Sequence, residues 1–115
     1  MNKQRRSVLR KAISQLANAN TLAVKDKTIS HLKVVQQAVQ ECADDEEFAY
    51  DNLPESLQYS ERGEDMSENV SILNDASADL EAIIEQIKLS EVYSYDLIKD
   101  DMVRITNLIQ DTIDK

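Results

Sequence analysis

The chain contains a single glycine, Gly63, and a single proline, Pro54, and both lie in one ten-residue window. Tight turns between strands depend on Gly, Pro, Asn and Asp, which adopt or stabilise unusual backbone angles. A β protein of 115 residues would need several clusters of these residues, spread along its length. The sequence therefore predicts an all-α fold made of long helices, with its one well-defined connector over 51–60.

One long segment after Pro54 shows the strongest helical periodicity in the chain. Its apolar seam recurs every seven residues, at Met66, Leu73, Leu80 and Ile87. This spacing is typical of coiled-coil helices, because it keeps one stripe of side chains facing a partner helix. We therefore expect a helix over 61–90 that packs along a second helix, since a helix this long and one-sided is not stable alone.

Three further segments carry apolar residues at helical spacing, which predicts helices over 3–18, 27–50 and 95–113. The stripe of the middle one is heptad-like and comprises Ile29, Leu32, Val35, Val39 and Cys42. Polar residues favour a break near 19–26, where Asp26 and Thr28 are candidate N-caps.

Two junctions stay open at this point. One continuous helix over 3–50 is an alternative to the break near 19–26. Residues 91–96 contain two tyrosines and a valine but no Gly or Pro, so they fit a bend, a short loop or an unbroken helix.

The connector is predicted to form a helix-hairpin corner. Pro54 has no amide hydrogen and disfavours helical backbone angles for Leu53. Asn52 and Ser60 are candidates to cap backbone groups on either side of the corner. We expect Leu53 and Leu57 to pack onto the helices that they join.

Together these segments predict one all-helical domain over 1–115, a helical hairpin extended into a coiled-coil-like bundle of three or four helices. The core would be thin, because the chain has one Phe, four Tyr and no Trp. A bundle of this size gains stability when it buries further apolar surface against a second copy. We therefore expect a homo-oligomer, most simply a dimer.

Charge is unevenly distributed along the chain, which carries a net charge of −9. Residues 1–33 hold eight Lys or Arg and one Asp, whereas residues 41–85 hold fifteen Asp or Glu and one Arg. The strongest basic cluster comprises Lys3, Arg5, Arg6, Arg10 and Lys11. Opposite charge on the two regions favours docking of this cluster on an acidic helix, within one copy or across a dimer.

The sequence contains no recognisable catalytic, cofactor-binding or metal-binding constellation. His31 is the single histidine. A metal site with several histidines is therefore excluded, and a catalytic triad would have to use this one residue. The run Asp44–Glu47 cannot converge on one ion, because successive helical residues point in different directions. We interpret this run as a solvated helix face and Cys42 as a small apolar residue, and we expect a non-enzymatic protein without a cofactor or metal.

No apolar run reaches the roughly 18 residues that a membrane-spanning helix needs, so we expect no membrane segment. The basic N-terminal segment is not followed by the apolar stretch of a signal peptide. These features predict a cytoplasmic protein.

Residues 46–66 carry the sequence EEFAYDNLPESLQYSERGEDM. This stretch resembles a group of small, functionally uncharacterised helical proteins from phages and mobile elements of Gram-positive bacteria. Their shared pattern is a Tyr-Asp-Asn-Leu-Pro-Glu linker followed by Ser-Glu-Arg and a long acidic helix, and their basic start is matched by Arg5 and Arg6. The segment between Arg6 and Glu46 is longer than in that group, and residues 91–115 add a further helix. The resemblance implies a phage or prophage origin and a role in host takeover, counter-defence or element maintenance, but no established activity.

Three functions are consistent with these features. The leading one is a protein-interaction or adaptor protein of phage type that modulates a host protein. A second is an acidic decoy whose carboxylates mimic DNA, which carries one charge per ~1.7 Å of axis. A third is a nucleic-acid-binding accessory protein that uses the basic cluster of the first helix, although no aromatic residue lies nearby to stack a base.

Overall fold

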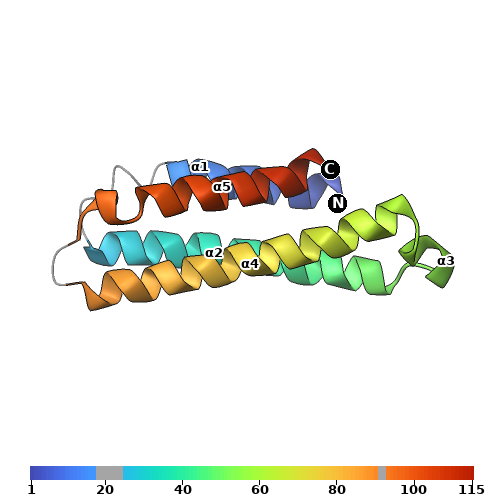
Figure 1. The fold of residues 1–115 in the computed structure, drawn as a ribbon, viewed down its shortest axis with the longest axis horizontal. Helices are drawn as coiled ribbons and strands as arrows, with labels where there is room; N and C mark the ends of the chain where they lie inside the picture. The colour runs from blue at the N-terminus through green and yellow to red at the C-terminus, as the bar shows by residue number, and fades with distance from the viewer. Residues whose placement is uncertain (18–24, 91–92) are drawn as a thin grey trace.

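A computed structural model of the chain describes residues 1–17, 25–90 and 93–115. Its four long helices form an antiparallel, up-down-up-down bundle (Figure 1). They are α1 (Lys3–Ala17), α2 (Lys25–Asp51), α4 (Glu61–Leu89) and α5 (Lys99–Asp114). The described residues contain no strand, so the predicted all-α bundle is confirmed, and it has four main helices.

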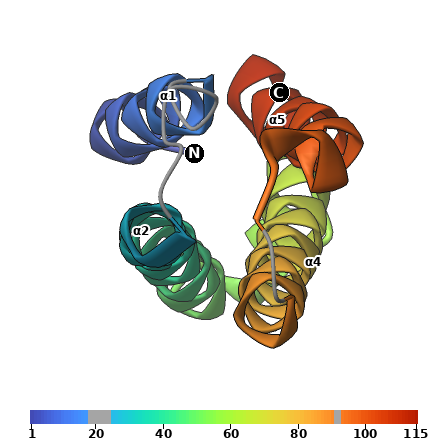
Figure 2. The same ribbon diagram turned by 90° about the vertical axis from the view of Figure 1, so that its left-hand side faces the viewer.

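Figure 2 shows the four helices around a common axis, with α1 and α5 on one side and α2 and α4 on the other. The contact between α2 and α4 is the most extensive, and α1 and α5 contact each other as well as the hairpin. Arg5 reaches Glu46 and His31 reaches the carbonyl of Gln15, so α1 and α2 lie side by side and antiparallel. One continuous helix over 3–50 is therefore wrong.

The core is a stack of aliphatic layers supplied by the seams expected from the sequence. On the hairpin, the seam residues at most 4% exposed are Leu32, Val35, Val39 and Cys42 of α2 and Met66, Leu73, Ala76, Leu80, Ile83 and Ile87 of α4. Leu9 and Leu16 from α1, with Ile105 and Ile109 from α5, complete these layers. The alternating three- and four-residue spacing keeps α2 and α4 in contact along their length.

The four helices are unequal in length. With 27 and 29 residues, α2 and α4 are about 40 Å long, whereas α1 and α5, with 15 and 16 residues, are about 23 Å long. Both chain ends lie beside the hairpin well before its far end (Figure 1). The hairpin therefore projects from the bundle, and we call its far end, residues 44–68, the hairpin tip.

Several helix boundaries differ from those expected. The predicted helix over 27–50 begins at Lys25 as α2, and Thr28 is buried inside it and is not an N-cap. The predicted helix over 95–113 begins with a separate 3-10 turn, η2 (Tyr95–Leu97), because the backbone of Ile98 departs from helical angles before α5 starts. The predicted break near 19–26 falls largely on residues 18–24, which lie outside the described residues.

The predicted connector over 51–60 is more structured than expected, because it contains a short helix, α3 (Glu55–Gln58). The Asn52 side chain donates to the carbonyl of Phe48 at 2.7 Å, at the end of α2. The Ser60 hydroxyl accepts from the amide of Gly63 at 3.3 Å and so caps the start of α4.

The two leucines of the corner behave differently from each other. Leu53 is half-buried, whereas Leu57 is 47% exposed. The expectation that both leucines pack onto the joined helices is therefore wrong for Leu57. Its side chain lies on the short α3, with nearly half of its surface in solvent.

The single glycine has a steric role at this corner. A Cβ atom at Gly63 would lie far inside contact distance of the carbonyl oxygens of Leu57 and Gln58. Those oxygens belong to the backbone of α3, so they cannot move aside as a flexible side chain could. Gly63 therefore allows α3 to fold back against the first turn of α4.

We expect Gly63→Ala to lower the free energy of unfolding by about 1–3 kcal/mol, because the added methyl group forces α3 away from α4. Replacing a helical glycine usually has the opposite effect, since alanine has the higher helix propensity. Urea unfolding monitored by circular dichroism tests this, with Ser71→Ala on the exposed face of α4 as the control. Equal or greater stability of Gly63→Ala would contradict the steric role.

Candidate functional site

Glu46 is the most unusual side chain in the bundle, because its carboxylate is fully buried. The interpretation of Asp44–Glu47 as a solvated face is wrong for this residue, although Asp44, Asp45 and Glu47 are exposed. Glu46 follows Cys42 by four positions and so continues the apolar seam of α2 into the core.

Three groups surround the buried carboxylate. The guanidinium of Arg5 lies 3.4 Å from Oε1, and the side-chain amide of Asn69 donates to Oε2 at 3.3 Å. The α-amino group of Met1 lies 3.8 Å from Oε2. Hydrogen bonds to charged groups offset part of the large cost of removing a carboxylate from water.

Asn69 occupies the equivalent place on α4, between Met66 and Leu73 in the seam. Its nitrogen must face Glu46, because its oxygen would be repelled by the carboxylate. That oxygen has no hydrogen-bond partner among the described residues. Arg5, Glu46 and Asn69 thus form a polar layer within a mostly aliphatic core.

The predicted basic cluster is divided between the interior and the surface. Arg5 joins the polar layer, and the guanidinium of Arg6 donates to the carbonyl of Lys115 at 2.8 Å. Lys3, Arg10 and Lys11 are exposed and form no ion pair with any residue that the structure describes. Docking of the cluster on an acidic helix thus occurs within the chain, but only Arg5 takes part.

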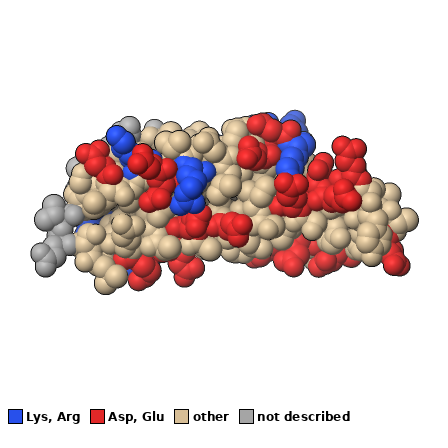
Figure 3. Space-filling view, in the orientation of Figure 1, with Lys and Arg blue, Asp and Glu red and all other residues tan. Residues whose placement is uncertain are grey.

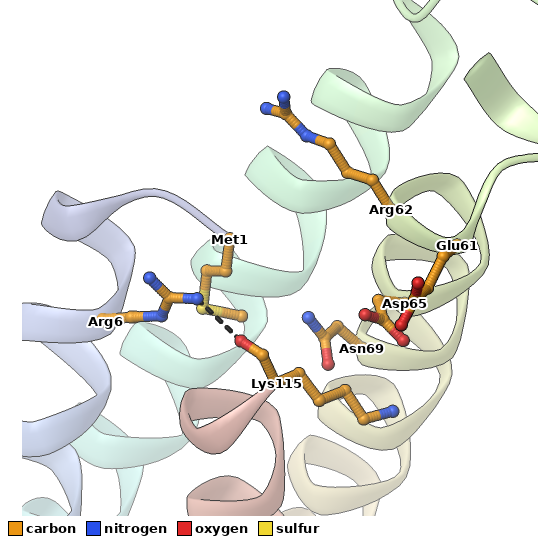
Figure 4. A pocket seen from close by; sticks show the side chains of 7 residues that line it. All are labelled: Met1, Arg6, Glu61, Arg62, Asp65, Asn69 and Lys115. Atoms are coloured by element: carbon orange, nitrogen blue, oxygen red, sulfur yellow. Dashed lines mark hydrogen bonds between the residues drawn. The ribbon is translucent and has the colours of Figure 1, made fainter.

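A pocket of about 400 Å³ lies where α1 and α5 end against α4. Figure 4 shows Arg6 and Lys115 meeting beside this pocket, with Glu61, Asp65 and Asn69 along α4. Arg62 also lines the pocket, so the lining carries both signs of charge. Counted as a whole, this lining does not favour a ligand of either charge.

The groups most suited to chemistry are engaged or unreactive. The ring of His31 contacts the carbonyl of Gln15. Burial, reinforced by the charge of Asp45, raises the pKa of the Cys42 thiol to about 11, which keeps the thiol protonated at neutral pH. Over the described ranges, no three His, Cys, Asp or Glu side chains converge as metal ligands. None of the helices in those ranges has the length and apolar character needed to cross a membrane.

The hairpin tip carries the whole net charge of the chain. It contains ten Asp or Glu and one basic residue, Arg62, for a net charge of −9, and the remaining residues balance to zero. Within the described part of the chain, only Glu46 and Glu68 among these ten form ion pairs. On the face shown in Figure 3, acidic side chains crowd the approach to the tip, and its far end is mostly uncharged, with an acidic side chain at its lower edge.

Large apolar side chains are exposed at the same tip. Tyr59 is 77% exposed at the end of α3, Phe48 is 74% exposed on α2, and Leu57 lies on α3 between them in sequence. The predicted corner residues therefore surround a surface that combines aromatic and aliphatic groups with carboxylates. The sequence analysis predicted only a structural corner here and not this exposed apolar surface. The available signal was Tyr59, an aromatic residue that lies outside every helical stripe.

We expect Glu46→Ala to lower the free energy of unfolding by roughly 3 kcal/mol, because it leaves the charge of Arg5 half-buried without its partner. Glu47→Ala, one residue further on an exposed face, should change it by less than about 0.5 kcal/mol. Chemical denaturation of both variants measures the difference. Similar stabilities for the two variants would show that the polar layer does not hold α1 on the hairpin.

We compared the chain with protein-family models, with curated proteins and with solved structures, and found no match in any of the three. The phage-type resemblance of residues 46–66 therefore stays a prediction.

Proposed function

We propose that this chain is a non-enzymatic protein-interaction module that binds a basic protein through its hairpin tip. The observation that carries the proposal is the coincidence, on the hairpin tip, of ten acidic residues and one basic residue, only Glu46 of the ten being buried, with exposed Leu57 and Tyr59. Aromatic side chains are enriched at the energetically important centres of protein interfaces. Carboxylates around them attract and orient a partner of opposite charge.

The shape of the molecule supports this assignment. The four-helix part of the bundle holds the hairpin rigid, while α3 and its neighbours extend beyond α1 and α5 (Figure 1). A tip of this kind can enter a partner's groove without disturbing the core. The resemblance of residues 46–66 to phage-type proteins adds that the partner is a cytoplasmic host protein.

Tyr59→Ala tests the proposal, because it removes the most exposed aromatic group of the tip without touching the core. We expect the immobilised wild-type protein to retain one basic host protein, and the variant to bind that protein about tenfold more weakly. Leu89→Ala is the matched control, since Leu89 is 84% exposed at the opposite end of α4. Equal retention by Tyr59→Ala would contradict docking through the tip.

An acidic decoy is the second candidate, favoured by the density of unpaired carboxylates on the tip. A decoy depends on charge, so its capture of a DNA-binding protein should collapse between about 0.05 and 0.5 M salt and survive Tyr59→Ala. An adaptor that uses Leu57 and Tyr59 should lose little affinity over the same range. One pull-down, measured for its salt dependence and for the effect of Tyr59→Ala, therefore distinguishes the two candidates.

A nucleic-acid-binding role has less support, because Arg5 and Arg6 are engaged within the bundle. Lys3, Arg10 and Lys11 remain available on the outer face of α1. A gel shift with duplex DNA and with single-stranded RNA tests them, using a variant in which all three are replaced by Gln. This variant keeps Arg5 and so leaves the polar layer intact, which deletion of residues 1–11 would not.

A further inference from the structure

Asn69 holds a buried acceptor atom for which the bundle supplies no donor. The side chain is 1% exposed, and its nitrogen donates to Glu46 at 3.3 Å. Its oxygen has no hydrogen-bond partner among the described residues. Buried polar atoms in native proteins are nearly always hydrogen-bonded, so this oxygen is suited to accept from a donor outside the bundle.

The same side chain lines the pocket of about 400 Å³ at the base of the hairpin tip. Figure 4 shows Asn69 pointing from α4 into this pocket, with Glu61 and Asp65 along the same helix. These three positions are spaced by four residues, which places them in one row on α4. Neither carboxylate of the row forms an ion pair within the described ranges. The row therefore presents three groups that are free to accept hydrogen bonds.

The cations that line the pocket are engaged or directed elsewhere. The guanidinium of Arg6 donates to the carbonyl of Lys115 at 2.8 Å, and the ammonium of Lys115 lies 2.7 Å from Glu68. The α-amino group of Met1 lies 3.8 Å from the buried carboxylate of the polar layer. Figure 4 shows the guanidinium of Arg62 directed away from the row. The lining as a whole carries both signs of charge, but the acceptors of the row favour a cationic ligand with several donors.

The row is too long for one metal ion and suits a long side chain. At 1.5 Å per residue, positions 61 and 69 are about 12 Å apart along the helix, whereas metal–oxygen bonds measure about 2.0–2.6 Å. The chain itself shows what fits here, because the Lys115 side chain runs from the end of α5 to α4 beside Asn69 (Figure 4). A long cationic side chain from outside α4 is thus accommodated at this row.

We infer that the pocket receives an arginine side chain of the basic partner, whose guanidinium donates to the Asn69 oxygen and to the Asp65 carboxylate. Side chains one helical turn apart are roughly 5–6 Å apart at their Cβ atoms. A guanidinium carries five N–H donors in a rigid planar fork and can bond two such acceptors, whereas a lysine ammonium is a compact point charge. The inference rests on the proposed function, because it names the side chain by which the tip recognises a basic protein.

Entry of the arginine requires a neighbouring side chain to move aside, because the Asn69 oxygen is itself buried. Lys115 can do so, since the ion pair that holds it to α4 in the described structure is with Glu68, whose side chain is 61% exposed. Ion pairs that open to solvent contribute little to stability, so exchanging one cationic side chain for another costs little. Lys115→Ala should therefore raise the affinity of the pocket for arginine.

Titration of the full chain with Nα-acetyl-arginine amide, followed by NMR of the backbone and side-chain amides, tests the site without the partner. We expect saturable shifts of the Asn69 side-chain amide, with a dissociation constant on the order of 1 mM. Nα-acetyl-lysine amide at the same concentrations controls for ionic strength and should bind several-fold more weakly, because its ammonium cannot bridge both acceptors.

A matched pair of charge variants tests the role of the row. Asp65→Asn keeps the size of the side chain and should weaken binding of the arginine probe about tenfold. Asp75→Asn makes the same change on an exposed face of α4, nearly three turns further on, and should bind as the wild type does. Retention of the basic partner should respond to the two variants in the same way. Circular dichroism establishes that each variant is folded.

Three results would overturn the inference. They are Asn69 signals that do not move at saturating probe, equal binding of the arginine and lysine probes, and equal weakening by Asp65→Asn and Asp75→Asn. Each of them leaves the proposed function standing if Tyr59→Ala still loses the basic partner. Binding of the arginine probe at Asn69, with partner capture that Tyr59→Ala does not change, would instead support the pocket and contradict docking through the aromatic group.

Discussion

Burial of one continuous aliphatic seam between α2 and α4 is the interaction on which the rest of the structure depends. Isolated helices of 15 or 16 residues, such as α1 and α5, are marginal in water, so they need the hairpin as a surface to pack on. The seam supplies that surface because its three- and four-residue spacing never leaves the contact face. With no Trp and one exposed Phe, the core is aliphatic, and its side chains fill layers of similar size.

The polar layer contributes less to the free energy of folding than the aliphatic seam does, but it specifies the register of α1 on the hairpin. A seam of aliphatic residues alone would hold α1 in several registers of similar energy, since Leu9, Ala12 and Leu16 have near equivalents one turn away. Arg5 can reach Glu46 in only one of them. A buried charge of this kind contributes little net stability, but its loss on misalignment is costly, which selects one position for α1.

The helices and their pairing were predictable from the sequence because they depend on periodicity, which is a local property. The corner was partly predictable, since Pro54, Asn52 and Ser60 act through their own backbone geometry. The burial of Glu46 was not foreseen, because composition placed it in an acidic run. The heptad spacing nevertheless indicates that both polar residues are buried. Glu46 lies four residues after Cys42, and Asn69 lies between Met66 and Leu73 in the seam. Exposure of Leu57 depends on α3, whose four residues are too few to produce a periodic pattern.

The confinement of the net charge to one end of a body 53 Å long gives each chain a permanent electric dipole along its axis. In the field of a basic partner, such a molecule turns so that its tip leads before any contact is made, which shortens the orientational search that limits association.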